Sequence, residues 1–492
     1  MLASSLDTTW TALERGLLAG ESLWRPSPFS LAHTSLWHKA LHEEALLLDE
    51  AELNELQTAE PCQLFAWASN GVAGTEISDR MEDLQEVLET CRVSAECVAP
   101  PFARRTQPRQ ARGIPGRKWE QIEAFAELAR AKGGGGSSKI VDWCSGKGHL
   151  ARQLYACGCC NEVDCLEIDK ALIAAGRALS PSLPIRFHEH DVLTDPLPSS
   201  VSGPSRMHTA LHACGELHRQ MLRTAVRERA QRLVVAPCCY EKHRLGSSSS
   251  SSSSSSFSDP FAAAFSPLSA TVASRSTLRL RHEDLYLARA DGPVTGSAKE
   301  RSLRTRERTW RLAFDCWRRE VTAGQQETAS LASAGDDDPL GAWRHTGVAC
   351  DEVVAAQREE AVLEVPSAPR RILVHGDALP EEAFATFCRH CVSADGRNAD
   401  ARRQLAPALE AAIASGALRS QGYVERGAAL LGRVERLELV RRAFQRPLEL
   451  WLASDLALYL EESGYDVEMT ALCERKITPR NIAIVAQRRL AS

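Results

Sequence analysis

The sequence predicts an α/β fold built on a doubly wound, mostly parallel sheet. Between residues 139 and 236, segments with strand character alternate with segments of helical periodicity, as they do in successive βαβ units. The segment KIVDWCSGKGHLARQL, residues 139–154, runs from apolar β-formers through a loop with two glycines into a helix. Carboxylates also stand at the ends of three expected strands, at the edge where such sheets bind ligands.

The elements follow in order along the chain. The expected strands are KIVDW, VDCLEI, PIRFHEH, MHTALHA and RLVVAP, and the expected helices are HLARQLYAC, KALIAAGRAL and LHRQMLRTAVRERA. After a long interruption, PLELWLASDLALYLEESG predicts an amphipathic helix with proline at its start and glycine at its end. YDVEMTAL and NIAIVAQ then predict two adjacent strands that close the same sheet.

This order divides the 492 residues into five regions. Leucine, alanine and glutamate recur at helical spacing early in the chain, and a serine run marks a linker without fixed structure. The polar stretch 323–339 predicts a disordered loop. We expect a helical N-terminal region at 1–100, the first part of the sheet domain at 101–245, a linker at 246–260, an inserted substrate module at 261–445, and the closing helix and strands at 446–492.

Composition places the chain among ordinary globular proteins. It is 44% hydrophobic and 25% charged, with a net charge of −5, so a nucleic-acid surface would have to be a local patch. No apolar run reaches the about 18 residues of a membrane span, and the N-terminus lacks the pattern of a secretory signal. The 16 cysteines are scattered, which indicates free thiols in a reducing, cytoplasmic compartment and no metal site.

The glycine loop fits more than one role. Gly146, Gly148 and Ala151, with Glu167 further along, match the G-x-G-x-x-A fingerprint of a dinucleotide site. A purely structural turn between strand and helix would favour the same glycines. The loop alone therefore leaves a nicotinamide-dependent oxidoreductase open.

The strand-end acids favour a different ligand. Asp142, Glu167 and Asp191 end three successive expected strands, so they are expected along one edge of the sheet. S-adenosylmethionine (SAM) suits this row, because Asp142 would lie near its ammonium, Glu167 would accept its ribose hydroxyls and Asp191 would accept its adenine amine. A pyrophosphate would instead be repelled by Asp142. Helix N-caps or solvated strand ends are the alternative for each acid.

Longer motifs point in the same direction. IPGRKWEQIEAFA, DWCSGKGHLARQL, LEID, ALHACGELH and APCCYEK occur in this order, and AFQRPLELWLASDLALYLEESGYDVEMTALCERKITPRNIAIVA follows near the C-terminus. They resemble the SAM-dependent methyltransferase domain shared by a bacterial family and by the eukaryotic methyltransferase-like-twenty-five proteins. The resemblance covers residues 112–244 and 430–488. It implies a Rossmann-like class I methyltransferase fold with SAM as the cofactor.

The resemblance also indicates the expected site residues. The cofactor-binding residues would be Lys118, Asp142, Cys144, Gly146, Gly148, Glu167, Asp169, Asp191 and Val192. The expected catalytic residues are His212, Cys214 and Tyr240. His212 would accept a proton from the methyl acceptor, and Tyr240 would stack on a planar group. A histidine packed at a turn is the alternative for His212.

The PCCY motif leaves two further alternatives for its cysteines. One is a cysteine nucleophile, although enzymes that use a Pro-Cys pair usually carry it after the fourth strand rather than the fifth. The other is a zinc or iron–sulfur site of Cys238 and Cys239 with others such as Cys157, Cys159 and Cys160. Adjacent cysteines rarely share one metal. We therefore expect a rigid wall of the substrate site and no metal.

Basic segments bear on the choice of acceptor. KERSLRTRERTWR, residues 299–311, carries six basic and two acidic side chains with Trp310, which suits a phosphate backbone or a solvated helix face. We expect a SAM-dependent methyltransferase that acts on RNA, with protein and small-molecule acceptors open and no membrane partner. An NAD(P)-dependent oxidoreductase and a non-catalytic SAM-binding protein-interaction module are the alternatives.

Overall fold

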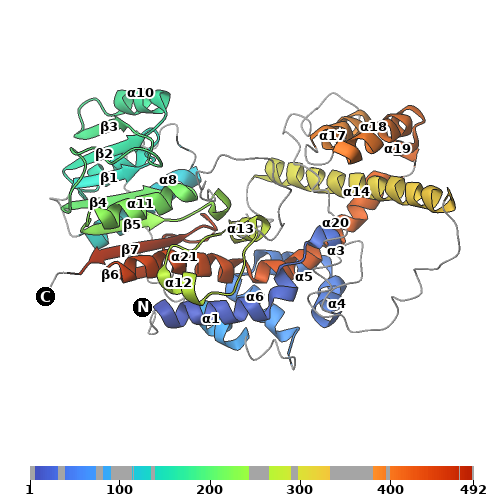
Figure 1. Ribbon diagram of the computed structural model, residues 1–492, viewed down its shortest axis with the longest axis horizontal. Helices are drawn as coiled ribbons and strands as arrows, with labels where there is room; N and C mark the ends of the chain where they lie inside the picture. Colours follow the sequence, from blue (N-terminus) through green and yellow to red (C-terminus); the bar gives the residue numbers. More distant parts are fainter. Residues whose placement is uncertain are drawn as a thin grey trace. The chain divides into compact units, whose positions relative to one another are not determined.

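The computed structural model divides the chain into two compact units (Figure 1). The sheet unit comprises 1–21, 60–292 and 442–492, and the helical unit comprises 22–59 and 293–441. The structure describes residues 6–31, 39–73, 81–89, 114, 116–133, 139–242, 265–289, 297–332, 380–394, 399–420, 422–475 and 477–489. The expected linker at 246–260 lies outside the described residues.

One seven-stranded sheet forms the centre of the sheet unit (Figure 1). Its strands are β1 (Lys139–Trp143), β2 (Glu162–Glu167), β3 (Ile185–Glu189), β4 (Arg206–Leu211), β5 (Arg232–Ala236), β6 (Tyr465–Ala471) and β7 (Ile482–Arg488). Their order is β3-β2-β1-β4-β5-β7-β6. The first five strands are parallel, and β7 pairs antiparallel with both β5 and β6. The last two strands therefore close the sheet begun by the first five, as expected.

Helices cover the sheet and account for the α/β class. Those that accompany the parallel strands are α8 (Gly116–Gly133), α9 (His149–Ala156), α10 (Lys170–Leu179) and α11 (Glu216–Arg227), and the short η1 (Tyr240–Lys242) follows β5. A hydrophobic core lies between α8, α9 and the sheet, with the fully buried Phe125, Ile140 and Leu154 among its members. The predicted fold class, an α/β protein with a Rossmann-like, mostly parallel sheet and a helical N-terminal region, is confirmed.

Helix α21 (Gln445–Glu462) differs from the amphipathic helix that its sequence predicts. Nearly all of its side chains are buried, because α1, α12 and α13 pack on it in addition to β6 and β7. Two of its four acidic residues are buried with partners. Glu449 pairs with Arg446 at 2.6 Å, and Asp455 accepts hydrogen bonds from the amides of Leu268 and Ser269 at 2.9 Å.

The N-terminal helices are divided between the two units. They are α1 (Leu6–Ala19), α2 (Glu21–Trp24), α3 (Pro28–Leu31), α4 (Lys39–Leu47), α5 (Glu50–Thr58) and α6 (Pro61–Asn70). In α1, the buried carboxylate of Glu14 accepts a hydrogen bond from the indole of Trp451 at 2.7 Å, which fastens the start of the chain to α21. In the helical unit, Arg436 donates hydrogen bonds to the carbonyl of Leu48 and to the carboxylate of Glu50, both at 2.8 Å.

The inserted region is also divided. Helices α12 (Ala270–Arg275) and α13 (His282–Arg289) pack on α21 in the sheet unit. The helical unit contains α14 (Ala298–Ala332), α17 (Pro380–Ala394), α18 (Ala399–Ala414), α19 (Ala417–Ser420) and most of α20 (Tyr423–Ala443). This division differs from the regions expected from the sequence. Residues 323–332 of the polar stretch also continue α14 instead of forming a loop.

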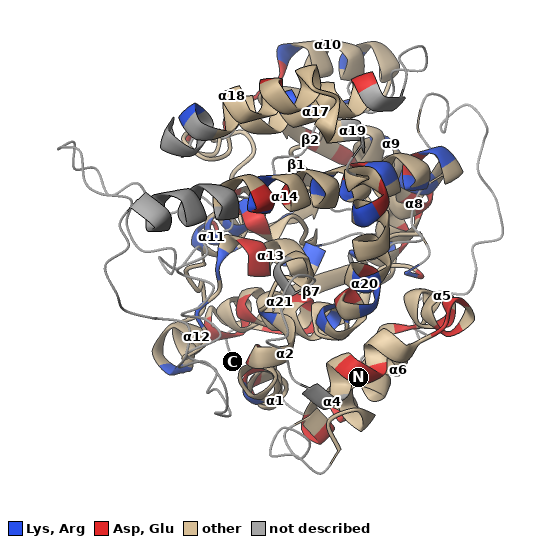
Figure 2. Cartoon of the chain, turned by 90° about the vertical axis from the view of Figure 1, so that its right-hand side faces the viewer, with Lys and Arg blue, Asp and Glu red and all other residues tan. Residues whose placement is uncertain are grey.

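The basic segment 299–311 lies on α14, and its aromatic residue faces a hydrophobic core. Trp310 is only 6% exposed and packs edge-on against Phe387. Arg308 pairs with Glu435 and Glu438 of α20, and acidic residues lie among the more numerous basic residues of α14 (Figure 2). The ring of Trp310 is therefore not available to a nucleic acid on the surface of this helix. Among the described residues, no helix is both long and apolar enough to span a membrane.

A close contact between α14 and α20 gives a test of the helical unit. A Cβ atom at Gly427 would lie 2.5 Å from the carbonyl oxygen of Thr309 and 2.8 Å from the amide nitrogen of Ala313. Gly427→Ala is therefore expected to destabilise this unit by about 2 kcal/mol, since both neighbours are backbone atoms that cannot move alone. Urea unfolding followed by circular dichroism measures the change.

The matched control is Gly432→Ala on the same helix. A Cβ at Gly432 would meet only the flexible guanidinium of Arg436, at 3.5 Å, so alanine is expected to stabilise the helix by about 0.5–1 kcal/mol. Equal effects of the two substitutions would contradict the close packing of α14 on α20.

Candidate functional site

The candidate site lies at the carboxyl edge, by which we mean the C-terminal ends of β1 to β5 and the loops that follow them. Strands β2 and β3 lie on one side of β1, and β4 and β5 lie on the other. The chain therefore reverses its direction of winding between β1 and β4. In open α/β sheets, ligands bind at such a switch point, outside the carboxyl ends of the strands.

The loop between β1 and α9 has an unusual backbone. Cys144, Gly146 and Gly148 all have positive φ angles, of 56°, 57° and 67°. The amide of Ser145 donates to the carbonyl of Leu166 at 3.1 Å, which ties the loop to β2. A Cβ at Gly146 would meet nothing within 4 Å, so the glycine supplies the left-handed turn and leaves the backbone open to a ligand.

Asp142 is the most perturbed acid of the carboxyl edge. Its side chain is 1% exposed, and burial raises its pKa to about 8, with Glu167 adding to the shift and a hydrogen bond from Thr209 opposing it. Its Oδ2 atom has no hydrogen-bond partner among the described residues. A buried carboxylate oxygen without a partner is costly, and such atoms are typical of functional sites.

Glu167, at the end of β2, holds the glycine loop. Its Oε2 accepts a hydrogen bond from the amide of Gly146 at 2.8 Å. Its Oε1 accepts hydrogen bonds from the amides of Ile168 and Asp169 at 2.9 and 3.0 Å. A carboxylate offers about four lone-pair sites, so one acceptor position of Oε2 stays open to a further donor.

The next two acids have local structural partners. Asp169 caps α10, because its Oδ1 accepts the amides of Ala171 and Leu172. Asp191 lies two residues beyond the end of β3 instead of ending the strand, and its Oδ1 accepts the amide of Leu193 at 3.0 Å. In both residues the described hydrogen bonds use one carboxylate oxygen. Val192 is buried.

Lys118 on α8 reaches the carboxyl edge from outside the sheet. The side chain is exposed, and its positive charge acts on His149 and on His212. His149, the first residue of α9, was not among the expected site residues. Burial, Arg152 and Lys118 lower its pKa to about 4. A basic side chain and a neutral histidine therefore accompany the glycine loop.

His212 follows β4 and has a positive φ of 68°, which is uncommon for a residue with a Cβ. Its side chain is exposed at the loop, yet the surrounding protein desolvates the imidazole and lowers its pKa to about 4, with Lys118 and Arg480 acting in the same direction. The imidazole is therefore neutral at pH 7 and able to accept a proton.

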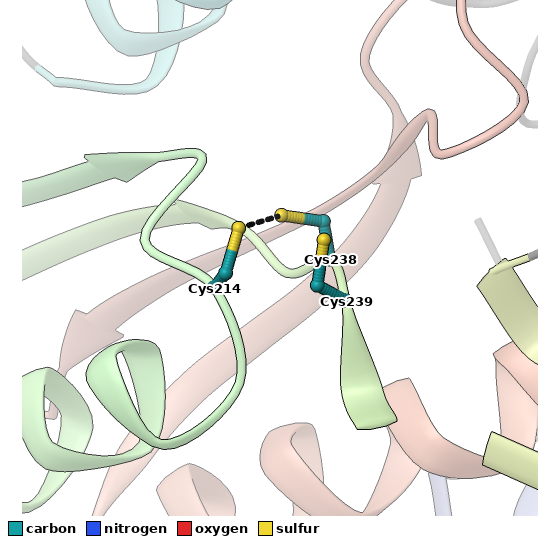
Figure 3. Close-up of side chains that lie close together, drawn as sticks. All are labelled: Cys214, Cys238 and Cys239. Atoms are coloured by element: carbon teal, nitrogen blue, oxygen red, sulfur yellow. Dashed lines mark hydrogen bonds between the residues drawn. The ribbon is translucent and has the colours of Figure 1, made fainter. Parts of the chain in front are cut away.

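Three cysteines gather at the ends of β4 and β5 (Figure 3). The Sγ atoms of Cys214, Cys238 and Cys239 lie within 4.8 Å of one another, and those of Cys214 and Cys238 are 3.3 Å apart. Cys238 and Cys239 are buried and Cys214 is half-buried. Hydrogen bonds from the other two thiols lower the pKa of Cys239 to about 2. We call these residues the three-thiol cluster.

Sequence reasoning placed these cysteines only in part. It grouped Cys238 and Cys239 with Cys157, Cys159 and Cys160, but these three lie at the C-terminal end of α9 and pack in the core there. Cys214 joins the cluster because β4 and β5 are neighbours whose ends, Leu211 and Ala236, are in register. Cys214 lies three residues beyond the end of β4, and Cys238 and Cys239 lie two and three residues beyond the end of the adjacent strand β5. This similar spacing was the signal that could have found the cluster.

Tyr240 lies beneath the edge. It is 1% exposed and its ring contacts that of His218 edge-on, with centroids 6.2 Å apart. Its hydroxyl has no hydrogen-bond partner among the described residues. Cys144 faces the site more openly, and burial raises its thiol pKa to about 12. In this conformation the buried ring of Tyr240 presents no exposed face for stacking.

The comparisons with known proteins agree with this architecture. Residues 117–244 match the family model of a methyltransferase domain, and no curated protein matches the chain. Among solved structures, the chain is similar to SAM-bound CalS10, an amino pentose methyltransferase from Micromonospora echinaspora, with 22% identity over 25% of this chain and 52% of that chain, at a TM-score of 0.21. It is also similar to a SAM-dependent methyltransferase from Mesorhizobium loti, with 23% identity, 23% and 52% coverage and a TM-score of 0.19.

The matched part of the chain spans about half the length of these solved structures, and TM-scores this low carry no argument of their own. The conclusion therefore rests on the family match and the strand order. Residues 117–244 form a methyltransferase domain, and the sheet has the Rossmann-like class I fold of the SAM-dependent methyltransferases.

Proposed function

We propose that the protein is an active methyltransferase that binds SAM at the carboxyl edge and transfers its methyl group to an acceptor near the loops after β4 and β5. The observation that carries this proposal is Asp142, a carboxylate that is 1% exposed at the end of β1 and has an Oδ2 atom without a partner among the described residues. When bound, SAM supplies an electrophilic methyl group on a sulfonium.

The residues of the edge suit the separate parts of this ligand. Asp142 would attract the ammonium of the aminoacyl end, because a nearby cation favours the ionised carboxylate. Glu167 would accept a ribose hydroxyl with the lone pair that Gly146 leaves open. Asp191 would accept the adenine amine, and Val192 would supply apolar contact to the ring. Cys144, Gly148, Lys118 and Asp169 complete the proposed cofactor site.

On the acceptor side, His212 would take up the acceptor's proton. Its lowered pKa keeps the imidazole neutral at physiological pH, which is the form that a general base requires. Cys214 and Tyr240 complete the proposed catalytic set, Cys214 at the same loop and Tyr240 by supporting it from below. Positioning the acceptor in line and excluding water would supply most of the rate enhancement.

The proposal also includes the protein's kin, its location in the cell and its methyl acceptor. The ordered motifs from IPGRKWEQ to APCCYEK support kinship with the methyltransferase-like-twenty-five proteins and their bacterial relatives. Thirteen described cysteines are free thiols, which supports a reducing, cytoplasmic location. RNA is the acceptor we propose to test first, on the strength of the basic side chains of α14 alone, with protein and small molecules as alternatives.

The experiment is a methyl-transfer assay with isotopically labelled SAM on total RNA, total protein and a small-molecule extract, run in parallel. We expect one of the three fractions to incorporate label. If the acceptor is assigned correctly, that fraction is RNA. Label in protein alone would reject RNA and keep the methyltransferase. SAM binding without transfer to any fraction would instead indicate a non-catalytic interaction module. Retention of NAD(P)H, with no binding of SAM, would indicate an oxidoreductase.

A further inference from the structure

We propose that the three-thiol cluster is a metal site, in which Cys214, Cys238 and Cys239 bind Zn²⁺ as thiolates and leave a fourth coordination position open. The proposal concerns residues that the SAM site does not use for cofactor binding. It is tested without SAM, so its failure would leave the proposed methyltransferase function untouched.

The backbone explains how two adjacent cysteines reach one point. Successive side chains of an extended chain point to opposite sides, which would separate Cys238 from Cys239. Cys239 instead has a positive φ of 51°, and this turn brings both sulfurs to the same side (Figure 3). A left-handed conformation costs about 1–2 kcal/mol for a residue with a Cβ. Such strain persists at functional sites, where it is part of the construction.

The loop after β4 is built in the same way. His212 has a positive φ of 68°, and the chain then turns so that Cys214 faces the loop after β5. Backbone hydrogen bonds fix the two loops to each other, since the amide of Gly215 donates to the carbonyl of Cys238 at 3.2 Å. The thiols therefore need no bond of their own to stay together, and their proximity is available for a ligand.

The distances suit one metal ion. Zn–S bonds of about 2.3 Å in tetrahedral geometry hold two sulfur ligands about 3.8 Å apart. The three Sγ atoms lie within 4.8 Å of one another, with the closest pair at 3.3 Å. Small side-chain rotations that move each sulfur by a few tenths of an ångström are enough to reach this geometry. Cys214 is half-buried, which leaves the ion a path of entry.

The charges near the cluster favour an anionic metal complex. Three thiolates and one Zn²⁺ carry a net charge of −1, which is costly to bury alone. The positive charges of Arg289 and Arg480 act on Cys239, and that of Lys242 acts on Cys214. Arg289 also pairs with Glu241 at 3.2 Å, and its charge is therefore shared between Glu241 and the cluster.

The number of ligands indicates the type of site. Among the described residues, the group of histidine, cysteine and acidic side chains that meets at this point contains only the three cysteines. Structural zinc sites have four protein ligands, whereas catalytic sites have three and keep one position for water or substrate. The open position would lie at the carboxyl edge, between the loops where the acceptor is proposed to bind.

The test uses the full-length protein, stripped with a chelator under reducing conditions and then titrated with Zn²⁺ or Co²⁺ alone. We expect one ion per chain and, with Co²⁺, the charge-transfer absorption of thiolate ligands. Cys214→Ser, Cys238→Ser and Cys239→Ser should each weaken binding by more than about 100-fold, since loss of an outer-sphere partner alone costs about 10–100-fold.

The control is Cys157→Ser, because Cys157 is half-buried like Cys214 but lies at the end of α9. Its metal affinity should equal that of the unmodified protein. The proposal is overturned if the unmodified protein binds neither ion, if Cys157→Ser weakens binding as much as the cluster variants do, or if peptide mapping of protein purified without a reductant finds Cys214 and Cys238 joined as a disulfide.

Discussion

Replacing Asp142 by asparagine should weaken the binding of S-adenosylhomocysteine by about 100-fold, as measured by isothermal titration calorimetry. The substitution keeps the size of the side chain and removes the charge that would face the ligand's ammonium. A hydrogen bond to a charged group contributes about 1.5–3 kcal/mol, and the buried position of Asp142, at 1% exposure, limits compensation by water. An unchanged affinity would exclude Asp142 from the cofactor site and remove the main support of the proposed function.

The same substitution should make the ligand-free protein more stable than the unmodified protein, and this difference should grow as the pH rises. The pKa of Asp142 is about 8 in the folded protein and about 3.9 in an unfolded chain, so the folded state binds the proton more tightly. Above pH 4 the unfolded carboxyl loses its proton first, and the unmodified protein loses up to about 1.4 kcal/mol of stability per pH unit until pH 8. Asparagine does not titrate and escapes this loss.

Unfolding in urea at pH 5, 7 and 9 measures this difference. The free energy of unfolding of Asp142→Asn, relative to the unmodified protein, should increase from pH 5 to pH 8 and then level off. Asp466→Asn on β6 is the control, because that side chain is 76% exposed and its loss should change stability by less than about 0.5 kcal/mol at every pH. A flat difference for Asp142→Asn would mean that the carboxyl is ionised in the folded state.

The sheet could be predicted from the sequence because its local signals agree with its tertiary environment. Strands such as KIVDW and RLVVA are buried on both faces, so a continuous apolar run and a helical repeat after it are enough to recognise each βαβ unit. Asp142 and Glu167 could be placed at strand ends for the same reason, whereas Asp191 lies two residues beyond the end of β3. Periodicity misjudged α21, because its outer face is covered by α1, α12 and α13, which come from distant parts of the chain.

The candidate site was less predictable because it depends on backbone turns and on neighbours in space. Nothing in the pair Cys238–Cys239 announces the φ of 51° that turns both sulfurs together, and Cys214 joins them only through the pairing of β4 with β5. The sequence left the basic segment around Trp310 open between a phosphate-binding surface and a solvated helix face. Its tryptophan instead packs in a core against Phe387, which is distant in the sequence.

Gly215→Ala should be the most destabilising of the substitutions considered, because it acts on the backbone that joins the two site loops. Gly215 has a φ of 59° and a ψ of −124°, a combination that residues with a Cβ avoid. An added Cβ would lie 2.3 Å from the carbonyl oxygen of Lys242. We expect a loss of about 4 kcal/mol from strain and steric overlap together, measured by urea unfolding.

Gly158→Ala separates the backbone strain from the steric overlap. Gly158 also has a positive φ, of 73°, but a Cβ there would meet nothing within 4 Å, so only the backbone cost of about 1–2 kcal/mol applies. If the loops after β4 and β5 are joined as described, Gly215→Ala must also move Cys214 away from Cys238 and lower thiol-dependent metal binding, whereas Gly158→Ala must not. A stable Gly215→Ala protein with intact metal binding would show that these loops separate freely, because the added Cβ would then not overlap the carbonyl of Lys242 in solution.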